Sequence, residues 1–172
     1  MPDDNPPANK PAKPRELDRY DLANASCRLL KLALRRAGEL VVEETGEAGL
    51  RPRPFMTLIA IQQNPGVTQN DLVKITGSDR STIGELIQRF VSRGFVTRKR
   101  DAKDQRVNLL SITEAGELAL RVNLHGALRA EERFRAMVPA AQREAFFNIL
   151  AQLAEYDEES AGDAEAKTAS VS

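Results

Sequence analysis

The side chains in this sequence with the most evident chemistry are cations gathered in one short stretch. Residues 89–106 hold seven basic residues and two acidic ones, although the whole chain has 25 of each sign. Such a run is usually only a solvated face, but clustered guanidinium and ammonium groups also bind the phosphates of nucleic acid. The basic members are Arg89, Arg93, Arg98, Lys99, Arg100, Lys103 and Arg106.

Catalytic chemistry has little support in the sequence. The single histidine, His125, falls in the middle of a predicted helix with no Cys or His partner at metal-binding spacing. The sequence also has no glycine-rich phosphate loop and no nucleophile elbow. We therefore expect no enzyme, no cofactor and no metal site. A purely structural dimerisation protein would leave the basic run without a purpose.

Two short helices are predicted immediately before the basic stretch. Thr68 can cap the first helix and Asp71 can bond back to it, while Gly77 can take the left-handed conformation that ends a helix and turns the chain. Ser78 is predicted to cap the second helix. The apolar residues of that helix, from Ile83 to Val91, recur at helical spacing. Two helices joined by a short turn containing glycine are typical of a helix-turn-helix, whose second helix enters a DNA groove.

A hairpin is predicted to follow the second helix. Residues 95–100 favour a strand that begins apolar and ends basic, residues 101–105 a turn, and residues 106–112 a returning strand. Thr113, with Glu114 after it, is predicted to cap the next helix. The basic hairpin therefore follows directly after the helix that would contact bases in a groove. In this order the hairpin can bind the phosphate backbone beside that groove.

Five motifs in this region carry a resemblance: GVTQNDL at 66–72, DRSTI at 79–83, RGFV at 93–96, DQR at 104–106 and SITEAG at 111–116. In order and spacing they resemble the winged helix-turn-helix of the MarR family of bacterial transcriptional regulators, and the resemblance extends over roughly residues 18–158. It implies a wing in which Asp104 orients the loop and Arg106 reaches the minor groove or its phosphates.

The sequence departs from the family at Gly84 and Glu85, where many relatives have a hydroxyl residue and an arginine. Glu85 can accept a hydrogen bond from a cytosine amino group, or it can pair with Arg89 one turn later. We favour the pairing with Arg89. The predicted DNA-binding residues are Thr68, Gln69, Ser78, Arg80, Ser81, Thr82, Glu85, Gln88, Arg89, Arg98, Lys99, Arg100, Lys103, Asp104 and Arg106.

The predicted architecture is mostly α with a small β-hairpin wing. Long amphipathic helices are expected from Asp18 to about Glu44, from Glu114 to about Met137, and from Pro139 onward. They offer more apolar surface than one small domain needs, so we expect an intertwined homodimer bound to a pseudo-palindromic double-stranded operator. The segments are a disordered proline-rich arm (1–15), an N-terminal dimerisation helix (16–50), the DNA-binding domain (51–112), C-terminal dimerisation helices (113–158) and a disordered tail (159–172).

Composition agrees with a folded protein, since 41% of the residues are hydrophobic. No apolar run has the length of a membrane span, no signal-peptide pattern opens the chain, and the single cysteine cannot form an internal disulfide. We therefore expect a cytoplasmic protein that does not enter membranes.

Control by a small molecule is expected from the family resemblance. It implies a repressor released from its operator when an effector binds between the dimer helices and the DNA-binding domain. Basic residues among apolar ones suit an aromatic acid or its coenzyme A thioester. The predicted walls are Arg28, Leu32, Arg35, Phe55, Ile59 and His125. The alternative is a redox-sensing regulator acting through Cys27, although a lone cysteine among apolar residues is most often a small core residue.

Overall fold

The computed structural model of the chain describes residues 19–155. The predicted disordered arm (1–15) and tail (159–172) lie outside the described residues. The chain divides into two compact units, residues 1–36 and 37–172, with the division inside one helix.

In the first unit, the predicted start of the N-terminal helix at Asp18 is wrong. A short 3-10 turn, η2 (Leu22–Asn24), precedes α1 (Ser26–Thr45), so the α-helix begins well after Asp18. The carboxylate of Asp21 accepts from the backbone N–H groups of Ala23 and Asn24 and from the Asn24 side chain. These local bonds give the backbone an alternative to the helix.

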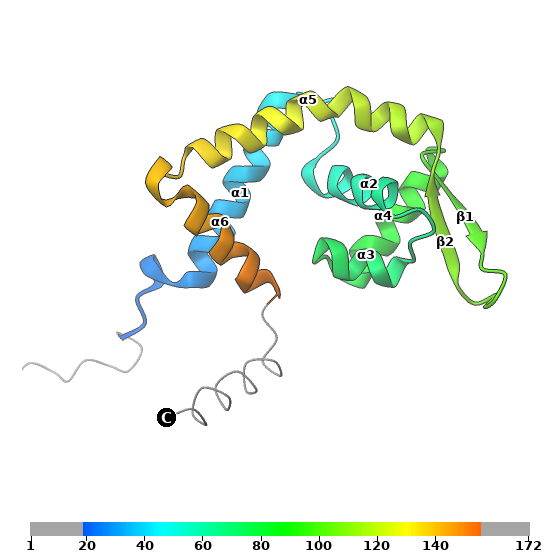
Figure 1. Ribbon diagram of the computed structural model, residues 1–172, viewed down its shortest axis with the longest axis horizontal. Helices are drawn as coiled ribbons and strands as arrows, with labels where there is room; N and C mark the ends of the chain where they lie inside the picture. The colour runs from blue at the N-terminus through cyan, green and yellow to red at the C-terminus, as the bar shows by residue number, and fades with distance from the viewer. Residues whose placement is uncertain (1–18, 156–172) are drawn as a thin grey trace, which may run out of the picture. The chain divides into compact units, whose positions relative to one another are not determined.

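The second unit contains the end of α1 and the remaining elements. They are α2 (Pro52–Gln63), α3 (Gln69–Thr76), α4 (Arg80–Ser92), β1 (Val96–Arg100), β2 (Asn108–Ile112), α5 (Glu114–Ala136) and α6 (Ala140–Glu155). Helices α3 and α4 follow each other across a tight turn, and the β1–β2 hairpin comes next (Figure 1). The predicted fold class, mostly α with a hairpin wing, is confirmed.

One hydrophobic core holds these parts together. Its buried residues come from α2, α3, α4, both strands and α5, and include Leu58, Leu72, Ile87, Leu110 and Leu120. The spacing of the apolar residues in α4 turns one side of that helix into the core and leaves the other side free. The core therefore fixes the orientation of α4 relative to the hairpin.

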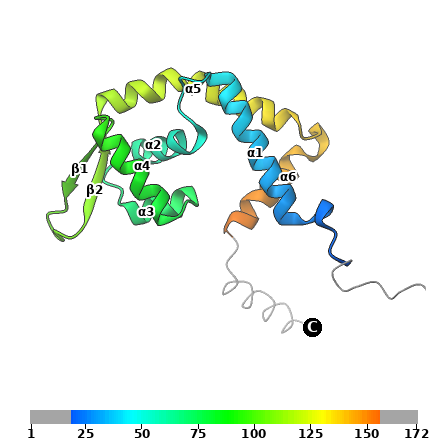
Figure 2. The same cartoon turned by 180° about the vertical axis from the view of Figure 1, so that it is seen from behind.

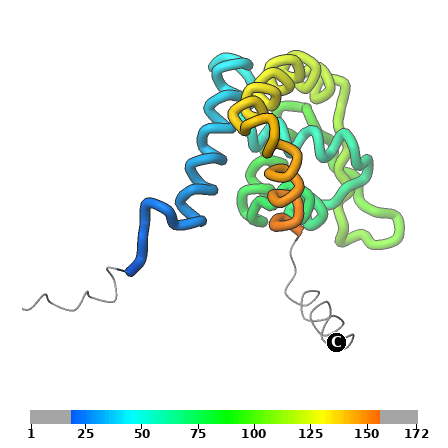
Figure 3. Tube along the Cα trace, turned by 60° about the vertical axis from the view of Figure 1, so that its left-hand side comes forward, coloured from blue at the N-terminus to red at the C-terminus, as the bar shows by residue number. Residues whose placement is uncertain are grey.

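The hairpin is tied to the helices at its base. Strands β1 and β2 pair antiparallel, with Val96 opposite Ile112 and Arg100 opposite Asn108. A further bridge joins Val67, just before α3, to Leu110 of β2. The backbone N–H of Leu110 donates to the carbonyl of Val67 at 3.0 Å. Figures 2 and 3 show the hairpin projecting from the cluster of α2, α3 and α4, so its tip is free to contact another molecule.

The start of α5 is locked against the hairpin. The Thr113 hydroxyl donates to the carbonyl of Gly94 at 2.6 Å and also accepts from the Gly116 N–H, so it caps α5 as predicted. A Cβ on Gly116 would lie 2.3 Å from the Phe95 carbonyl oxygen, a distance that no side chain can occupy. Glycine is therefore required where α5 passes the base of the wing.

Farther along, α5 is held to the end of α1. Arg129 and Arg133 each donate to the Glu44 carboxylate at 2.7 Å, and Arg133 also contacts Glu43 at 2.9 Å. These hydrogen bonds, of which the one from Arg129 has the largest effect, lower the pKa of Glu44 below its ordinary value.

Within residues 19–155, no helix is long and apolar enough to cross a membrane.

Candidate nucleic-acid interface

The turn between α3 and α4 is built by two local capping arrangements. At the start of α3 the Thr68 hydroxyl accepts from the Asp71 N–H at 3.2 Å, and the Asp71 carboxylate accepts from the Thr68 N–H at 3.1 Å. At its end Gly77 has φ 64°, the left-handed conformation that closes the helix. Both features were predicted and are confirmed. They set the direction in which α4 leaves the turn.

The cap of α4 differs from the prediction. Asp79, not Ser78, precedes the helix, and its carboxylate accepts from the Thr82 N–H at 2.8 Å. Serine and aspartate are both good cap residues, so their order in the sequence did not decide between them. The carboxylate also accepts the Ser81 hydroxyl at 2.5 Å and the Thr82 hydroxyl at 2.7 Å.

These bonds determine the charge at the N-terminus of α4. The Ser81 hydroxyl, followed by the N–H and hydroxyl of Thr82, holds the pKa of Asp79 well below its usual range. Asp79 is thus ionised at neutral pH and occupies the helix end that would otherwise attract a phosphate. The hydroxyl groups of Ser81 and Thr82 already donate to Asp79, so their role in this structure is to stabilise the cap of α4.

The wing loop is shaped by its own hydrogen bonds. The Asp104 carboxylate accepts from the Arg106 N–H at 2.9 Å, which is how this aspartate orients the loop. The Arg100 guanidinium donates to the Gln105 carbonyl at 2.6 Å, so part of its bonding capacity is used within the wing. Arg106 is exposed, and no ion pair or side-chain hydrogen bond involves its guanidinium within residues 19–155.

A hollow of about 220 Å³ brings the N-terminus of α3, the N-terminus of α4 and the wing together. The bridge between Val67 and Leu110 explains this arrangement, because it holds β2 beside the residues that open α3. The hollow is mainly polar and carries two guanidinium groups, so it can receive an anionic, hydrogen-bonding partner. Its lining residues are Thr68, Gln69, Asn70, Arg80, Arg106, Val107 and Asn108.

Three of those lining residues, Asn70, Val107 and Asn108, were not among the predicted site residues. Asn70 lies beside Gln69 in the first turn of α3, and its polar side chain next to a predicted contact was a usable signal. Val107 and Asn108 join the hollow only through the pairing of β2 with Val67, which spans more than forty positions in the sequence and leaves no local pattern.

The remaining predicted cations lie along α4 and the hairpin. Lys99 and Lys103 are exposed, and Arg98 donates to the Gln88 side chain at 3.5 Å, linking β1 to α4. The favoured pairing of Glu85 with Arg89 is not formed, since no ion pair joins the two within the described residues. Instead both line a shallow hollow with Gly84 and Gln88.

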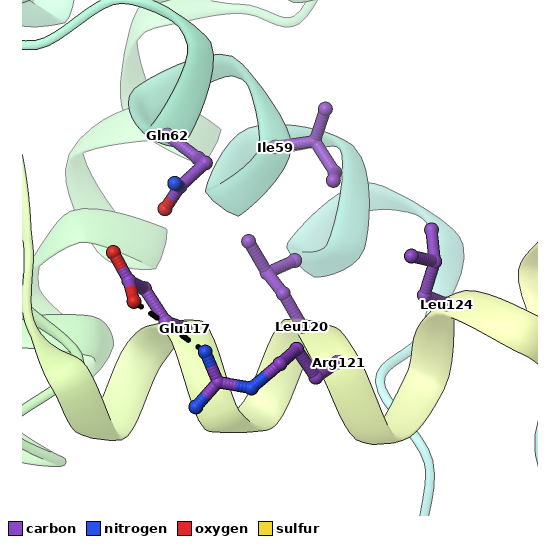
Figure 4. Close-up of a pocket in the computed structure, with 6 residues that line it drawn as sticks. All are labelled: Ile59, Gln62, Glu117, Leu120, Arg121 and Leu124. Atoms are coloured by element: carbon purple, nitrogen blue, oxygen red, sulfur yellow. Dashed lines mark hydrogen bonds and ion pairs between the residues drawn. The ribbon is translucent and has the colours of Figure 1, made fainter.

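A second hollow, of about 180 Å³, lies between α2 and α5 and is predominantly apolar (Figure 4). Ile59 and Gln62 face it from α2, and Leu120 points toward α2 from the opposite helix. Arg121 contacts Glu117 at 3.5 Å at its edge. Leu124 completes the lining. Of the predicted effector-binding residues, the structure places Ile59 here.

The other predicted effector-binding residues are distributed differently. Phe55 is partly buried against the core, and His125 is exposed on α5 next to Leu124. Arg28, Leu32 and Arg35 belong to the first unit, where the Arg28 guanidinium donates to the Ala23 carbonyl at 2.9 Å. Cys27 is a free, exposed thiol, contrary to the expectation of a small core residue.

The fold and this surface define a winged helix-turn-helix protein of the DNA-binding class. The sequence pattern of the MarR family matches residues 48–107. The chain is 26% identical over 139 residues to the HTH-type transcriptional repressor NicR of Pseudomonas putida. The aligned region covers 81% of this chain and 88% of NicR. This matched segment and the relative make the chain similar to transcriptional regulators of the MarR family.

Two solved structures are similar at comparable identity. The PcaV transcriptional regulator from Streptomyces coelicolor, solved in complex with its natural ligand, has a TM-score of 0.69 and 28% identity, over 79% of this chain and 96% of PcaV. The transcriptional repressor CouR, solved bound to a 23-mer DNA duplex, has a TM-score of 0.68 and 26% identity, over 78% of this chain and 95% of CouR.

Proposed function

We propose that this protein is a homodimeric repressor that binds a pseudo-palindromic operator and leaves it when a small aromatic acid binds. The observation that carries the proposal is the polar hollow that joins Arg80, at the start of α4, to Arg106 on the wing. These two cations come from elements with different tasks in DNA recognition. A helix can enter the major groove while a basic loop follows the neighbouring phosphates and minor groove.

The DNA contacts follow from this surface. Helix α4 would lie in the major groove with Arg80 and Arg89 near phosphates, and Arg106 would enter the minor groove, whose negative potential favours arginine. Thr68, Gln69 and Asn70 would hydrogen-bond the backbone from the start of α3. The structure of CouR on a DNA duplex supports a DNA-bound state for a protein of this fold.

The experiment is a gel shift of the full chain on the DNA upstream of its own coding sequence, with a shuffled duplex of equal length and base composition as competitor. We expect retention of the upstream DNA at protein concentrations that leave the shuffled duplex free. Equal retention of both duplexes would contradict sequence-specific operator binding. Salt concentration must be held fixed, because phosphate contacts make the affinity salt-dependent.

The dimer is supported by apolar side chains that a single chain leaves uncovered. Helix α6 has no buried residue, and its Ile149 and Leu153 are 54% and 61% exposed. In α1, Leu30 and Leu34 are exposed as well. Ile149 and Leu153 are four residues apart and so share one face of α6, and an exposed apolar face of this kind marks an interface in soluble proteins. A two-fold dimer would present two copies of α4 to two half-sites about one helical turn apart.

The effector site we propose is the hollow between α2 and α5. Its volume is below the usual range of sites for drug-sized ligands, roughly 300–1,000 Å³, so it suits a single aromatic ring. For a coenzyme A thioester, only the acyl part would fit inside. A carboxylate could replace Glu117 as the partner of Arg121, because that ion pair is long and solvent-exposed.

A thermal-shift screen of aromatic acids and their acyl-CoA esters tests the effector proposal, since a ligand that binds the folded state raises the melting temperature. We expect a free acid to raise the melting temperature and to release operator DNA. Arg121→Ala should lose both effects, whereas Arg53→Ala, at an exposed arginine of α2, should keep them. An effector response that survives Arg121→Ala would place the ligand elsewhere.

Redox control through Cys27 is the second candidate, and the exposure of its thiol is the observation that favours it. A sulfenic acid formed there would need an outside thiol for reversal, because the chain has no second cysteine. We expect that peroxide does not dissociate the wild type from its operator. We also expect the effector to release Cys27→Ser from the operator as it releases the wild type. Release of the wild type by peroxide, but not of Cys27→Ser, would replace effector control with redox control.

A further inference from the structure

Gly84 in α4 has no explanation within the fold. It lies inside the helix, and the residues with positive φ, such as Gly77, do not include it. A Cβ at Gly84 would meet no atom within 4 Å in the described structure. Glycine is, after proline, the least favourable residue in a helix interior, so alanine would suit this backbone better. The missing side chain therefore leaves open space on the surface of α4 that a molecule approaching from outside can enter.

The side of α4 that faces outward is defined by the core. Successive residues turn by about 100° around a helix, so Ser81, Glu85 and Gln88 fall opposite the buried side. The residues on the buried side are Ile83, Leu86, Ile87 and Phe90. The Ser81 hydroxyl already donates to the Asp79 carboxylate, and the side-chain amide oxygen of Gln88 accepts from Arg98. Glu85 is the charged residue on this outward line.

A carboxylate at this position restricts what α4 can contact in DNA. Glu85 forms no ion pair with Arg89 among residues 19–155, and a carboxylate is repelled by the phosphates on either side of a groove. It can only accept hydrogen bonds, and the donors in the major groove are the amino groups of cytosine and adenine. In adenine the N7 acceptor lies beside the amino group, so N7 would repel the second carboxylate oxygen of Glu85. Cytosine has no acceptor there.

We propose that Gly84 and Glu85 form a notch that reads one cytosine in each operator half-site. Glu85 accepts the hydrogen bond from the cytosine N4 amino group, and Gly84 leaves room for the edge of the base pair to come close to the helix backbone. The inference rests on the proposed operator binding. The shallow hollow lined by Gly84, Glu85, Gln88 and Arg89 is the physical space of this notch.

The cations of α4 complete the arrangement. Arg80 and Arg89 are nine residues apart, which at about 100° per residue places them on opposite flanks of the helix. Each can meet the backbone of a different strand while Glu85, between them, meets the bases. Removing the Glu85 carboxylate should therefore weaken discrimination and relieve repulsion at the same time. A purely structural role for Glu85 would produce neither effect.

The experiment starts from duplexes selected by the full-length wild-type protein out of a randomised pool. We expect one cytosine in each selected half-site, and replacing its base pair with thymine·adenine should weaken wild-type binding roughly 5- to 150-fold. Glu85→Ala should bind both duplexes equally and bind random DNA more tightly than the wild type does. Glu47→Ala removes an exposed carboxylate outside α4 and should behave as the wild type.

Gly84→Leu provides an independent variant, because leucine is a good helix former and nothing in the described structure obstructs its Cβ. Its circular dichroism and its affinity for random DNA should match the wild type, while its preference for the selected operator should be lost. If Gly84→Leu keeps that preference, or if Glu85→Ala selects the same bases as the wild type, the notch is wrong although operator binding stands. A wild-type protein that selects no sequence would instead overturn the proposed function itself.

Discussion

Arg106 is an exposed cation of the wing. Its backbone is fixed by Asp104, and its guanidinium is exposed at the edge of the polar hollow. We predict that Arg106→Ala weakens operator binding and reduces the slope of log affinity against log salt by roughly 0.9 for each lost phosphate contact. Fluorescence anisotropy over a range of salt concentrations measures both quantities.

The fold of this variant should be unchanged, because Arg106 is exposed and does not belong to the buried core. Its melting temperature should therefore equal that of the wild type. Arg53→Ala, which removes one positive charge from the surface of α2, provides the control for a general loss of charge. An Arg106→Ala protein that binds its operator as tightly as the wild type would remove the wing from the mechanism.

Asp79 has a different task, which is to hold the start of α4. We predict that Asp79→Ala lowers the melting temperature by a few degrees, because the N–H of Thr82 and the hydroxyls of Ser81 and Thr82 lose their acceptor. Asp79→Asn should retain part of the effect, since asparagine is also a good cap. Thermal unfolding followed by circular dichroism measures the difference.

The pH dependence of that difference follows from the lowered pKa of Asp79. A carboxyl group whose pKa is depressed by folding stabilises the protein above its unfolded pKa, about 3.9 for aspartate. That contribution is lost as the pH falls below this value toward the folded pKa. The wild type and Asp79→Ala should thus differ equally at pH 6 and pH 8 and converge in acid. A difference that grows in acid would contradict the assignment.

Among the elements, those with local signals could be predicted from the sequence. The capping box of Thr68 and Asp71, the left-handed Gly77 and the cap at Thr113 each depend on residues a few positions apart, and each is confirmed. The wing follows from a strand that begins apolar and ends basic, a polar turn and a returning strand. A helix-turn-helix with its wing is therefore largely encoded in short-range chemistry.

The errors arose where two local solutions compete or where distant residues meet. Ser78 and Asp79 are both good caps, and Asp21 favours a 3-10 turn over an earlier start of α1. The predicted pair of Glu85 with Arg89 has suitable spacing, yet spacing alone does not fix side-chain positions. The hollow between α2 and α5 joins residues some sixty positions apart, which no local pattern records.

The contact of α5 with the wing gives a prediction about these elements. Gly116→Ala would bring a Cβ to 2.3 Å from the Phe95 carbonyl oxygen, so α5 or the wing base must move. We expect the free energy of unfolding to fall by about 1–3 kcal/mol, the usual cost of overpacking. Urea denaturation measures this change.

Gly84→Ala is the matched control, because it also adds one methyl group to a helical glycine but meets open space. It should raise the free energy of unfolding by roughly 0.5–1 kcal/mol, since alanine is the better helix former. If both variants shift stability in the same direction, the steric account of Gly116 is wrong.

For the molecule as a whole, the terminal helices are expected to join two chains. The exposed Ile149 and Leu153 of α6 would be buried between the protomers, as would apolar residues of α1. We predict that the wild type sediments as a dimer at micromolar concentration and that Leu153→Asp sediments as a folded monomer, because a charge in that interface would be unpaired. Ile75→Asp, at an exposed position of α3, should remain dimeric. A monodisperse wild-type monomer would refute the dimer.

The most direct test of operator recognition by two copies of α4 and the wing is a hydroxyl-radical footprint of the full-length protein on its operator. We predict two equally protected segments on one face of the duplex, centred about 10–10.5 base pairs or a multiple of that apart. With Arg106→Ala, protection should fade at the outer minor grooves and persist in the centre of each half-site. A single protected segment, or protection with no fixed position on the duplex, would show that two copies of α4 and the wing do not recognise the operator together.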